Sequence, residues 1–333
     1  MGESSTFWYC SSSTQWPDVF DILLILFEAL GLLLNTAVAI LLFMLRGPCK
    51  TSLALLRGLV VSCMLACWVN LVEDVAPKVQ KTPSYHFNRL LCIFWQSRFL
   101  YWIFVVIASQ FLFFGVYRYL DMTGADDYKM LSEEYQIPTY STVITVFSVL
   151  ITGPQTLSVN LVGDDCNCSN RKINIPFLSL IYAQVYLWIA ILIVFDGSVL
   201  AYISVRLRRL LRTPAGCKRE DKLELLHFYN TGLSECQLST TTAAAAVCSS
   251  GITGSMCITP LFVSYLLFFS YDQLYQFASA VDLTTYVIGT QVQQCGELLI
   301  IGHFVLVPII IVVYIRPLRL GMKKCWRRLI DKT

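Results

Sequence analysis

The chain has 333 residues, of which 56% are hydrophobic and only 14% are charged. Charged residues make up about 25% of an ordinary soluble domain, so this composition excludes that class and favours a membrane protein. The formal net charge is +3, and we expect no nucleic-acid partner.

Seven apolar stretches are each long enough to cross a bilayer, for which a helix needs about 20 residues. The sequence therefore predicts an all-α membrane protein, a seven-transmembrane helix bundle that occupies residues 19–315. Residues 1–18 form the predicted N-terminal segment, and residues 316–333 form a tail with a short amphipathic helix. The predicted spans are 19–45, 52–72, 90–120, 139–163, 176–202, 240–270 and 283–315.

Lysine and arginine are distributed unequally between the two sides of this predicted bundle. Nineteen of the 25 lie in segments 46–57, 118–129, 206–222 and 316–332, which share one side. Because basic loops stay in the cytoplasm, the sequence predicts an extracellular N-terminus and a plasma-membrane protein. No Lys or Arg occurs in residues 1–18, so we expect the first span to act as an uncleaved anchor.

The tail after the seventh span alternates apolar and basic residues at helical spacing, which is typical of a helix lying on the inner leaflet. Cys325 lies among its basic residues and is a candidate for palmitoylation. Membrane lipids are therefore expected partners. The apolar face comprises Leu318, Met322, Cys325 or Trp326, and Leu329.

On the predicted outer side, Cys92 precedes the third span while Cys166 and Cys168 follow the fourth, so an extracellular disulfide from Cys92 to either is plausible. Asn167 begins an Asn-Cys-Ser glycosylation acceptor. A glycan beside a bridged Cys168 would be crowded, which favours Cys166, but the spacing leaves both pairings open.

No pattern of catalytic or metal-binding residues emerges. The three histidines are scattered, and His303 has no companion ligand at helical spacing, which favours a hydrogen-bonded core residue. We therefore expect no enzyme, no cofactor and no metal site.

Short marks follow one another in a characteristic order along the spans. Gly31 and Asn35 lie in the first span, and Tyr-Arg-Tyr at 117–119 ends the third. Cys-Ile-Thr-Pro at 257–260 lies in the sixth, and Val-Pro-Ile-Ile-Ile at 307–311 in the seventh. Together they resemble the rhodopsin-like (class A) G-protein-coupled receptor family over essentially the whole chain.

The resemblance implies that Arg118, with Tyr119 and Tyr202, contacts a heterotrimeric G protein. Proline removes a backbone hydrogen bond from a helix, so Pro260 and Pro308 are candidate bending points of a conformational switch.

Several family positions are altered. Cys63 replaces an acidic residue and Val307 replaces an asparagine, so we expect the family's internal sodium site to be lost. Tyr117 replaces the carboxylate before the arginine, and the sixth span opens without a carboxylate partner. Arg118 thus lacks the family's customary neighbouring carboxylate, and we expect the inactive state to be weakly held.

If the helices pack as in the family, nine residues face one outward-opening ligand cavity. Glu297, like Glu28, lies in an outer half, where a carboxylate would meet a cationic ligand group or an arginine such as Arg98. Leu100 stands where amine receptors carry an acid, and Ile301 where opsins carry the retinal lysine, which argues against both classes. The nine are Leu100, Tyr101, Phe104, Tyr182, Tyr186, Phe262, Tyr265, Gln293 and Glu297.

The interpretation that these features favour is a divergent receptor that binds an extracellular peptide or small molecule and activates a heterotrimeric G protein. Two alternatives stay open: a receptor-like seven-span protein that binds without signalling, and a transporter. A transporter would need polar residues along a continuous path.

Overall fold

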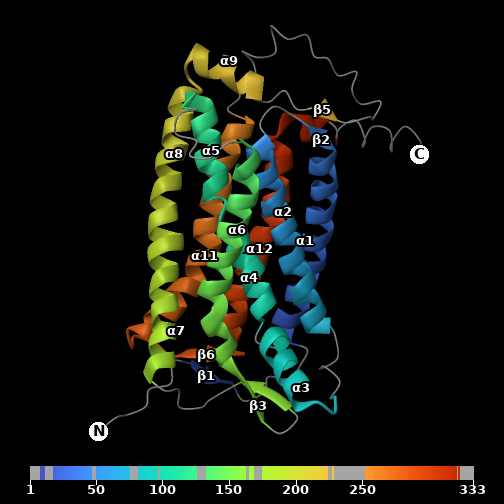
Figure 1. The fold of residues 1–333 in the computed structure, drawn as a ribbon, viewed down its shortest axis with the longest axis vertical. Coiled ribbons are helices and arrows are strands. Elements are labelled where there is room, and N and C mark those ends of the chain that lie inside the picture. The colour runs from blue at the N-terminus through green and yellow to red at the C-terminus, as the bar shows by residue number, and fades with distance from the viewer. Residues whose placement is uncertain are drawn as a thin grey trace, which may run out of the picture.

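The computed structural model describes residues 8–11, 18–46, 50–75, 82–96, 98–125, 133–162, 165–168, 175–223, 227–228, 252–320 and 322. Seven of its helical segments are long and apolar enough to cross a membrane. The predicted all-α bundle of seven membrane-spanning helices is confirmed (Figure 1). They are Val19–Met44, Lys50–Val75, Tyr85–Thr123, Tyr135–Leu157, Leu178–Leu210, Gly254–Ala280 and Gln291–Tyr314.

Three spans, the first, second and seventh, are single α-helices, whereas the other four change helix type along their length. The elements of the first two spans are α1 (Val19–Met44) and α2 (Lys50–Val75). The third contains α3 (Tyr85–Leu91), the π-helical η1 (Cys92–Gln96), α4 (Phe99–Ser109) and α5 (Leu112–Thr123). The fourth contains α6 (Glu133–Thr152) and the 3-10 helix η3 (Gly153–Ser158).

The fifth span contains α7 (Ile175–Leu187), the π-helical η4 (Trp188–Phe195) and α8 (Asp196–Leu210), and α9 (Pro214–Leu223) follows it. The sixth contains the 3-10 helix η5 (Gly254–Cys257) and α11 (Ile258–Ala280), and the seventh is α12 (Gln291–Tyr314). Residues 316–320 form a further helical turn, but most of the predicted amphipathic tail, including Cys325, lies outside the described residues.

The spans form a closed ring. Helix α1 packs between α2 and α12, α2 also contacts α4, and α11 packs between α12 and α8. The contact of α5 with α8 closes the ring, and α6 packs against α4 from outside (Figure 1). This order brings residues of α1, α2, α4 and α12 to one end of the bundle and residues of α5, α9 and η5 to the other.

Short pairs of strands lie at both ends of the helix bundle. Strand β1 (Trp8–Cys10) pairs in parallel with β6 (Tyr286–Ile288), and β3 (Val159–Val162) forms a hairpin with β4 (Asp165–Cys168). These pairs lie at the end that carries Cys92, here called the Cys92 end (Figure 1). Helix α9 and the pair of β2 (Leu45–Arg46) with β5 (His227–Phe228) lie at the opposite end, the Arg118 end.

The sixth span ends later than its sequence predicts, and its predicted start at residues 240–251 lies outside the described residues. Its described part runs from residue 254 to residue 280, instead of ending at residue 270. Asp272, Gln273 and Gln276 lie beyond the predicted end at residue 270, but the structure buries all three inside the bundle. The seventh span begins at Gln291 rather than 283 because residues 286–288 pair with β1, and Thr290 caps the helix.

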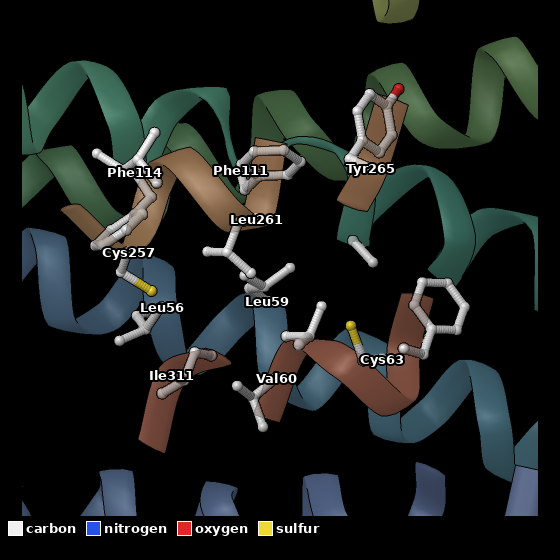
Figure 2. Close-up of a cluster of buried hydrophobic side chains, with 14 of the residues drawn as sticks. Leu56, Leu59, Val60, Cys63, Phe111, Phe114, Cys257, Leu261, Tyr265 and Ile311 are labelled. Carbon is white, nitrogen blue, oxygen red and sulfur yellow. The ribbon is translucent and has the colours of Figure 1, made fainter. Parts of the chain in front are cut away.

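The central core of the bundle and its outer surface are both largely apolar. Figure 2 shows Leu59, Phe111 and Leu261 meeting in the buried cluster between α2, the third span and α11. On the outside, Leu150 and Leu267 are 71% and 68% exposed. Such an apolar exterior suits hydrocarbon rather than water, in agreement with a multi-pass membrane protein.

Candidate functional site

Arg118, near the C-terminus of α5, is the centre of a buried polar network at the Arg118 end. Its Nη2 lies 3.1 Å from Oε1 of Glu220, and its Nε donates to Oγ of Ser255 over 2.7 Å. Ser255 also donates from its backbone N to Oε1 of Glu220 over 2.8 Å and from its hydroxyl to Oε2 over 2.5 Å. The side chains of Arg118 and Glu220 are only 8% and 2% exposed.

This network joins three segments that are distant in sequence: the third span, α9 and the start of the sixth span. A second contact fixes α9, because Nε of Arg219 donates to the backbone oxygen of Asp121 over 2.7 Å. Gly124 makes that approach possible: its φ is +74°, and a Cβ there would lie 2.3 Å from the Arg219 guanidinium. Helix α9 therefore closes over Arg118 rather than projecting away from the bundle.

The charge of Glu220 is stabilised despite its burial. Burial by itself would raise the pKa of this carboxyl, but the Arg118 guanidinium and the hydrogen bonds from Ser255 outweigh that effect and hold the pKa below its usual range. The pair is therefore an ion pair at neutral pH, with every part of the carboxylate hydrogen-bonded.

Arg118 nevertheless has a carboxylate partner, which the sequence analysis did not identify. The sixth span supplies a hydroxyl, and the carboxylate comes from the loop between the fifth and sixth spans. Sequence reasoning missed Glu220 because that loop was read only as a basic segment. The available signal was the 214–223 stretch itself, which begins with a proline at a helix start and places a carboxylate among basic residues.

The tyrosines assigned with Arg118 lie elsewhere. Tyr202 is 53% exposed, and its hydroxyl accepts from Nε of Arg206 over 3.0 Å. Tyr119 is half-buried. Tyr117, which replaces the family's acid, bonds the hydroxyl of Tyr140 over 3.0 Å and so ties α5 to α6. The structure thus brings only Arg118, of the three predicted coupling residues, into the network.

The two prolines lie in different settings. Pro308 is buried inside α12, and the carbonyl oxygen four residues earlier, that of Phe304, accepts from Nδ2 of Asn35 over 2.9 Å. Pro260 is the third residue of α11, directly after η5. Pro260 therefore lies in the first turn of α11, where this helix follows η5 without a break.

The Cys92 end holds a second polar cluster, centred on Arg98 at the start of α4. Arg98 pairs with Asp74 of α2 over 3.0 Å and with Glu297 of α12. Glu297 also accepts from Nε2 of Gln293 over 2.5 Å. The prediction that an outer carboxylate meets an arginine such as Arg98 is confirmed for Glu297. The backbone of Arg98 is left-handed, with φ of +55°, which an L-residue adopts at a cost.

Further polar groups lie near the ion pairs of Arg98. Nδ2 of Asn70 donates to Glu28, and both residues are fully buried. Glu73 lies close enough to Asp74, Arg98 and Glu297 for their charges to interact. Tyr101, one turn after Arg98, is fully buried and is also within electrostatic range of Glu28 and Glu297.

The nine predicted ligand residues lie in different surroundings. Tyr101, Gln293 and Glu297 belong to the polar cluster at the Cys92 end. Tyr265 is buried and donates to the backbone oxygen of Leu192 over 3.2 Å, whereas Tyr186 is 43% exposed and packs on Phe277. The four others are half-buried and pack against apolar neighbours, namely Leu100, Phe104, Tyr182 and Phe262.

The disulfide joins Cys92 to Cys166, with 5.5 Å between the two Cα atoms, and therefore selects the first of the two pairings left open by the sequence. It ties η1 to β4 at the Cys92 end. Asn167 lies in β4 directly beside the bridge.

His303 is buried, and its Nδ1 lies 3.0 Å from Oγ of Ser264, which agrees with the predicted core role. Within the described ranges, no group of three or more His, Cys, Asp or Glu residues is arranged to hold a metal ion. Comparison of the sequence with models of known protein families and with curated proteins found no match.

Proposed function

We propose that this chain is a receptor of the rhodopsin-like, G-protein-coupled kind, which binds an extracellular peptide or small molecule and activates a heterotrimeric G protein. The chain resembles that family in its ordered marks, and it has the seven-helix bundle that such a receptor requires. The loops with most of the lysines and arginines belong to the Arg118 end, which supports a cytoplasmic position for that end in the plasma membrane.

The observation that carries the proposal is the buried ion pair of Arg118 with Glu220. A guanidinium at the cytoplasmic end of the third span offers donors to the backbone carbonyls of a partner, but here Glu220 and Ser255 occupy those donors. The pair is thus an off state, and release of α9 from Arg118 is the switching step. A signalling protein needs such a two-state element between its ligand and its partner.

Asn35 and Pro308 supply a route between the two ends. Helix α12 carries Glu297 at the Cys92 end and Pro308 toward the Arg118 end, where the helix lacks one internal hydrogen bond. A ligand that shifts the outer half of α12 would change the bend at Pro308. The glycan at Asn167 and the palmitoyl group at Cys325 belong to the same proposal, since they suit the outer and inner sides respectively.

The test is G-protein nucleotide exchange without added ligand, in membranes that carry equal surface amounts of each variant. Glu220→Gln removes the charge that holds Arg118, so we expect exchange several-fold above wild type, whereas Glu220→Gln with Arg118→Glu falls back to background. Asp221→Asn is the matched control, because it removes a neighbouring charge of α9 that is not part of the network, and it leaves exchange unchanged.

Exchange at background for every variant, across a panel of G-protein classes, would contradict the proposal. That result would favour a seven-span protein that binds without signalling.

A further inference from the structure

The polar cluster at the Cys92 end carries more negative than positive groups. Four carboxyl groups come together there with one guanidinium, and this set is here called the outer carboxyl cluster. Arg98 donates from Nη2 to Asp74 and from Nη1 to Glu297. The cluster consists of Glu28, Asn70, Glu73, Asp74, Arg98 and Glu297.

The atoms of this cluster that have no hydrogen-bond partner in the described part of the chain are all acceptors. They are Oε2 of Glu28, Oδ1 of Asn70, and both carboxyl oxygens of Glu73. A buried acceptor without a donor is costly, and a buried carboxylate without a counter-charge more so. The four carboxyl groups therefore outnumber the one positive charge of the cluster, and these oxygens lack donors.

Two neutral, fully buried side chains in this region also carry an atom without a partner in the described part of the chain. Asn70 is 0% exposed and its amide nitrogen is bonded to Glu28, so its unpaired oxygen lies inside the cluster. Tyr101 is also 0% exposed, and its hydroxyl has no partner among the described residues. These groups are not a surface patch of acids, which water would satisfy.

The chemistry that fits is an organic cation. A primary ammonium brings three N–H donors and a guanidinium five, each with one positive charge. A metal ion fits less well, because the described residues contain no metal-binding group of three or more His, Cys, Asp or Glu. Arg98 shows the preference of the cluster, since it is held there by two carboxylates.

Arg98 is also the more exposed member of its ion pair with Glu297. Its side chain is 29% exposed, whereas that of Glu297 is 5% exposed.

We infer that the outer carboxyl cluster binds an organic cation through a primary ammonium or guanidinium group, with Glu73 and Glu28 as its counter-ions. This inference extends the proposed function and rests on it, because the cluster is a receptor's ligand site only if the chain is a receptor. Binding itself needs no G protein and is therefore testable separately.

The experiment measures the thermal unfolding midpoint of the full-length protein in lipid nanodiscs with propylammonium or methylguanidinium chloride. Sodium chloride maintains equal ionic strength in all samples, and 1-butanol serves as the neutral probe. At a concentration about ten times the dissociation constant, the cations raise the midpoint by about 3 °C, and the neutral probe does not. Glu73→Gln abolishes the rise, while Asp196→Asn, which removes a buried carboxyl of α8 outside the cluster, retains it.

Glu28→Gln is the second cluster variant, for use if Glu73→Gln does not fold. Arg98→Ala calibrates the assay, because it leaves Asp74 and Glu297 open to methylguanidinium. No rise in the wild type, or an equal rise in the cluster variant, overturns the inference. The wild-type unfolding midpoint could rise with the cations while G-protein nucleotide exchange stays at background. That result would support the cation site and reject only the signalling function.

Discussion

The amide nitrogen of Asn35 lies 2.9 Å from the carbonyl oxygen of Phe304, the one acceptor in α12 that Pro308 deprives of its helical donor. Asn35 also donates to the backbone oxygen of Gly31 in its own helix over 2.8 Å. One fully buried side chain thus replaces the missing bond of the proline and ties the first span to the seventh.

Asn35→Ala should lower the stability of the folded protein by about 1 kcal/mol, because the carbonyl of Phe304 is left buried without a donor. In a Pro308→Ala background, the new backbone N–H reaches that carbonyl, so the same change costs less. The measurement is a double-mutant cycle of unfolding midpoints. Thr36→Ala is the control, since its hydroxyl bonds only Leu32 within α1. An equal cost of Asn35→Ala in both backgrounds would reject the replacement of the proline's bond.

Ser255→Ala should raise basal nucleotide exchange, but less than Glu220→Gln. The change removes the hydroxyl that accepts from Arg118 and donates to Glu220, yet leaves the ion pair and the backbone donor of residue 255. Because the three groups form one unit, the double variant should exceed Glu220→Gln only slightly. Strictly additive effects of the two changes on the logarithm of the exchange rate would contradict the shared network.

The contribution of Glu220 to stability should depend on pH in a defined direction. Its folded pKa lies below the unfolded value, so the folded state gains stability above the unfolded pKa of about 4.3 and loses that gain as pH falls through the folded pKa. The difference in unfolding midpoint between wild type and Glu220→Gln should therefore stay constant from about pH 8 to 5.5 and shrink only at lower pH. A difference that already shrinks between pH 8 and 6 would be inconsistent with a lowered pKa.

Gly124→Ala should loosen α9. A side chain there is strained by the φ of +74° and collides with the Arg219 guanidinium. We expect tryptic cleavage after Arg219 to accelerate and basal exchange to increase. Gly58→Ala is the control, since nothing lies within 4 Å of a Cβ at that position in α2. Unchanged cleavage in Gly124→Ala would show that α9 does not depend on this close approach.

Cys92→Ser should lower the free energy of unfolding by about 2–5 kcal/mol, as removal of a native disulfide typically does. Peptide mapping of the unreduced wild type should recover Cys92 linked to Cys166. Cys295→Ser, which alters a free cysteine of α12, should change neither property. Recovery of Cys92 linked to Cys168 would be the contrary result.

The spans could be predicted because hydropathy is a local property of about 20 residues. The partner of Arg118 could not, because Glu220 lies 102 residues away in a loop whose folding depends on the docking of Arg219 and on Gly124. The late end of the sixth span was missed for a related reason. Asp272 lies two residues beyond the predicted end of that span, but Gln276 donates to it inside the bundle over 2.8 Å.

The pairing of β1 with β6 gives the N-terminal segment a mechanical role. Three residues, Trp8–Cys10, run parallel to the connector of α11 and α12. Helix α11 has 23 residues and is therefore about 35 Å long, so a rigid tilt of about 5° at the Arg118 end displaces its other end by about 3 Å. Strand β1 must then move together with β6, or the two strands must separate. A fluorescent label at Tyr9, which is half exposed, would therefore report from outside the bundle on the state of Arg118 at the opposite end.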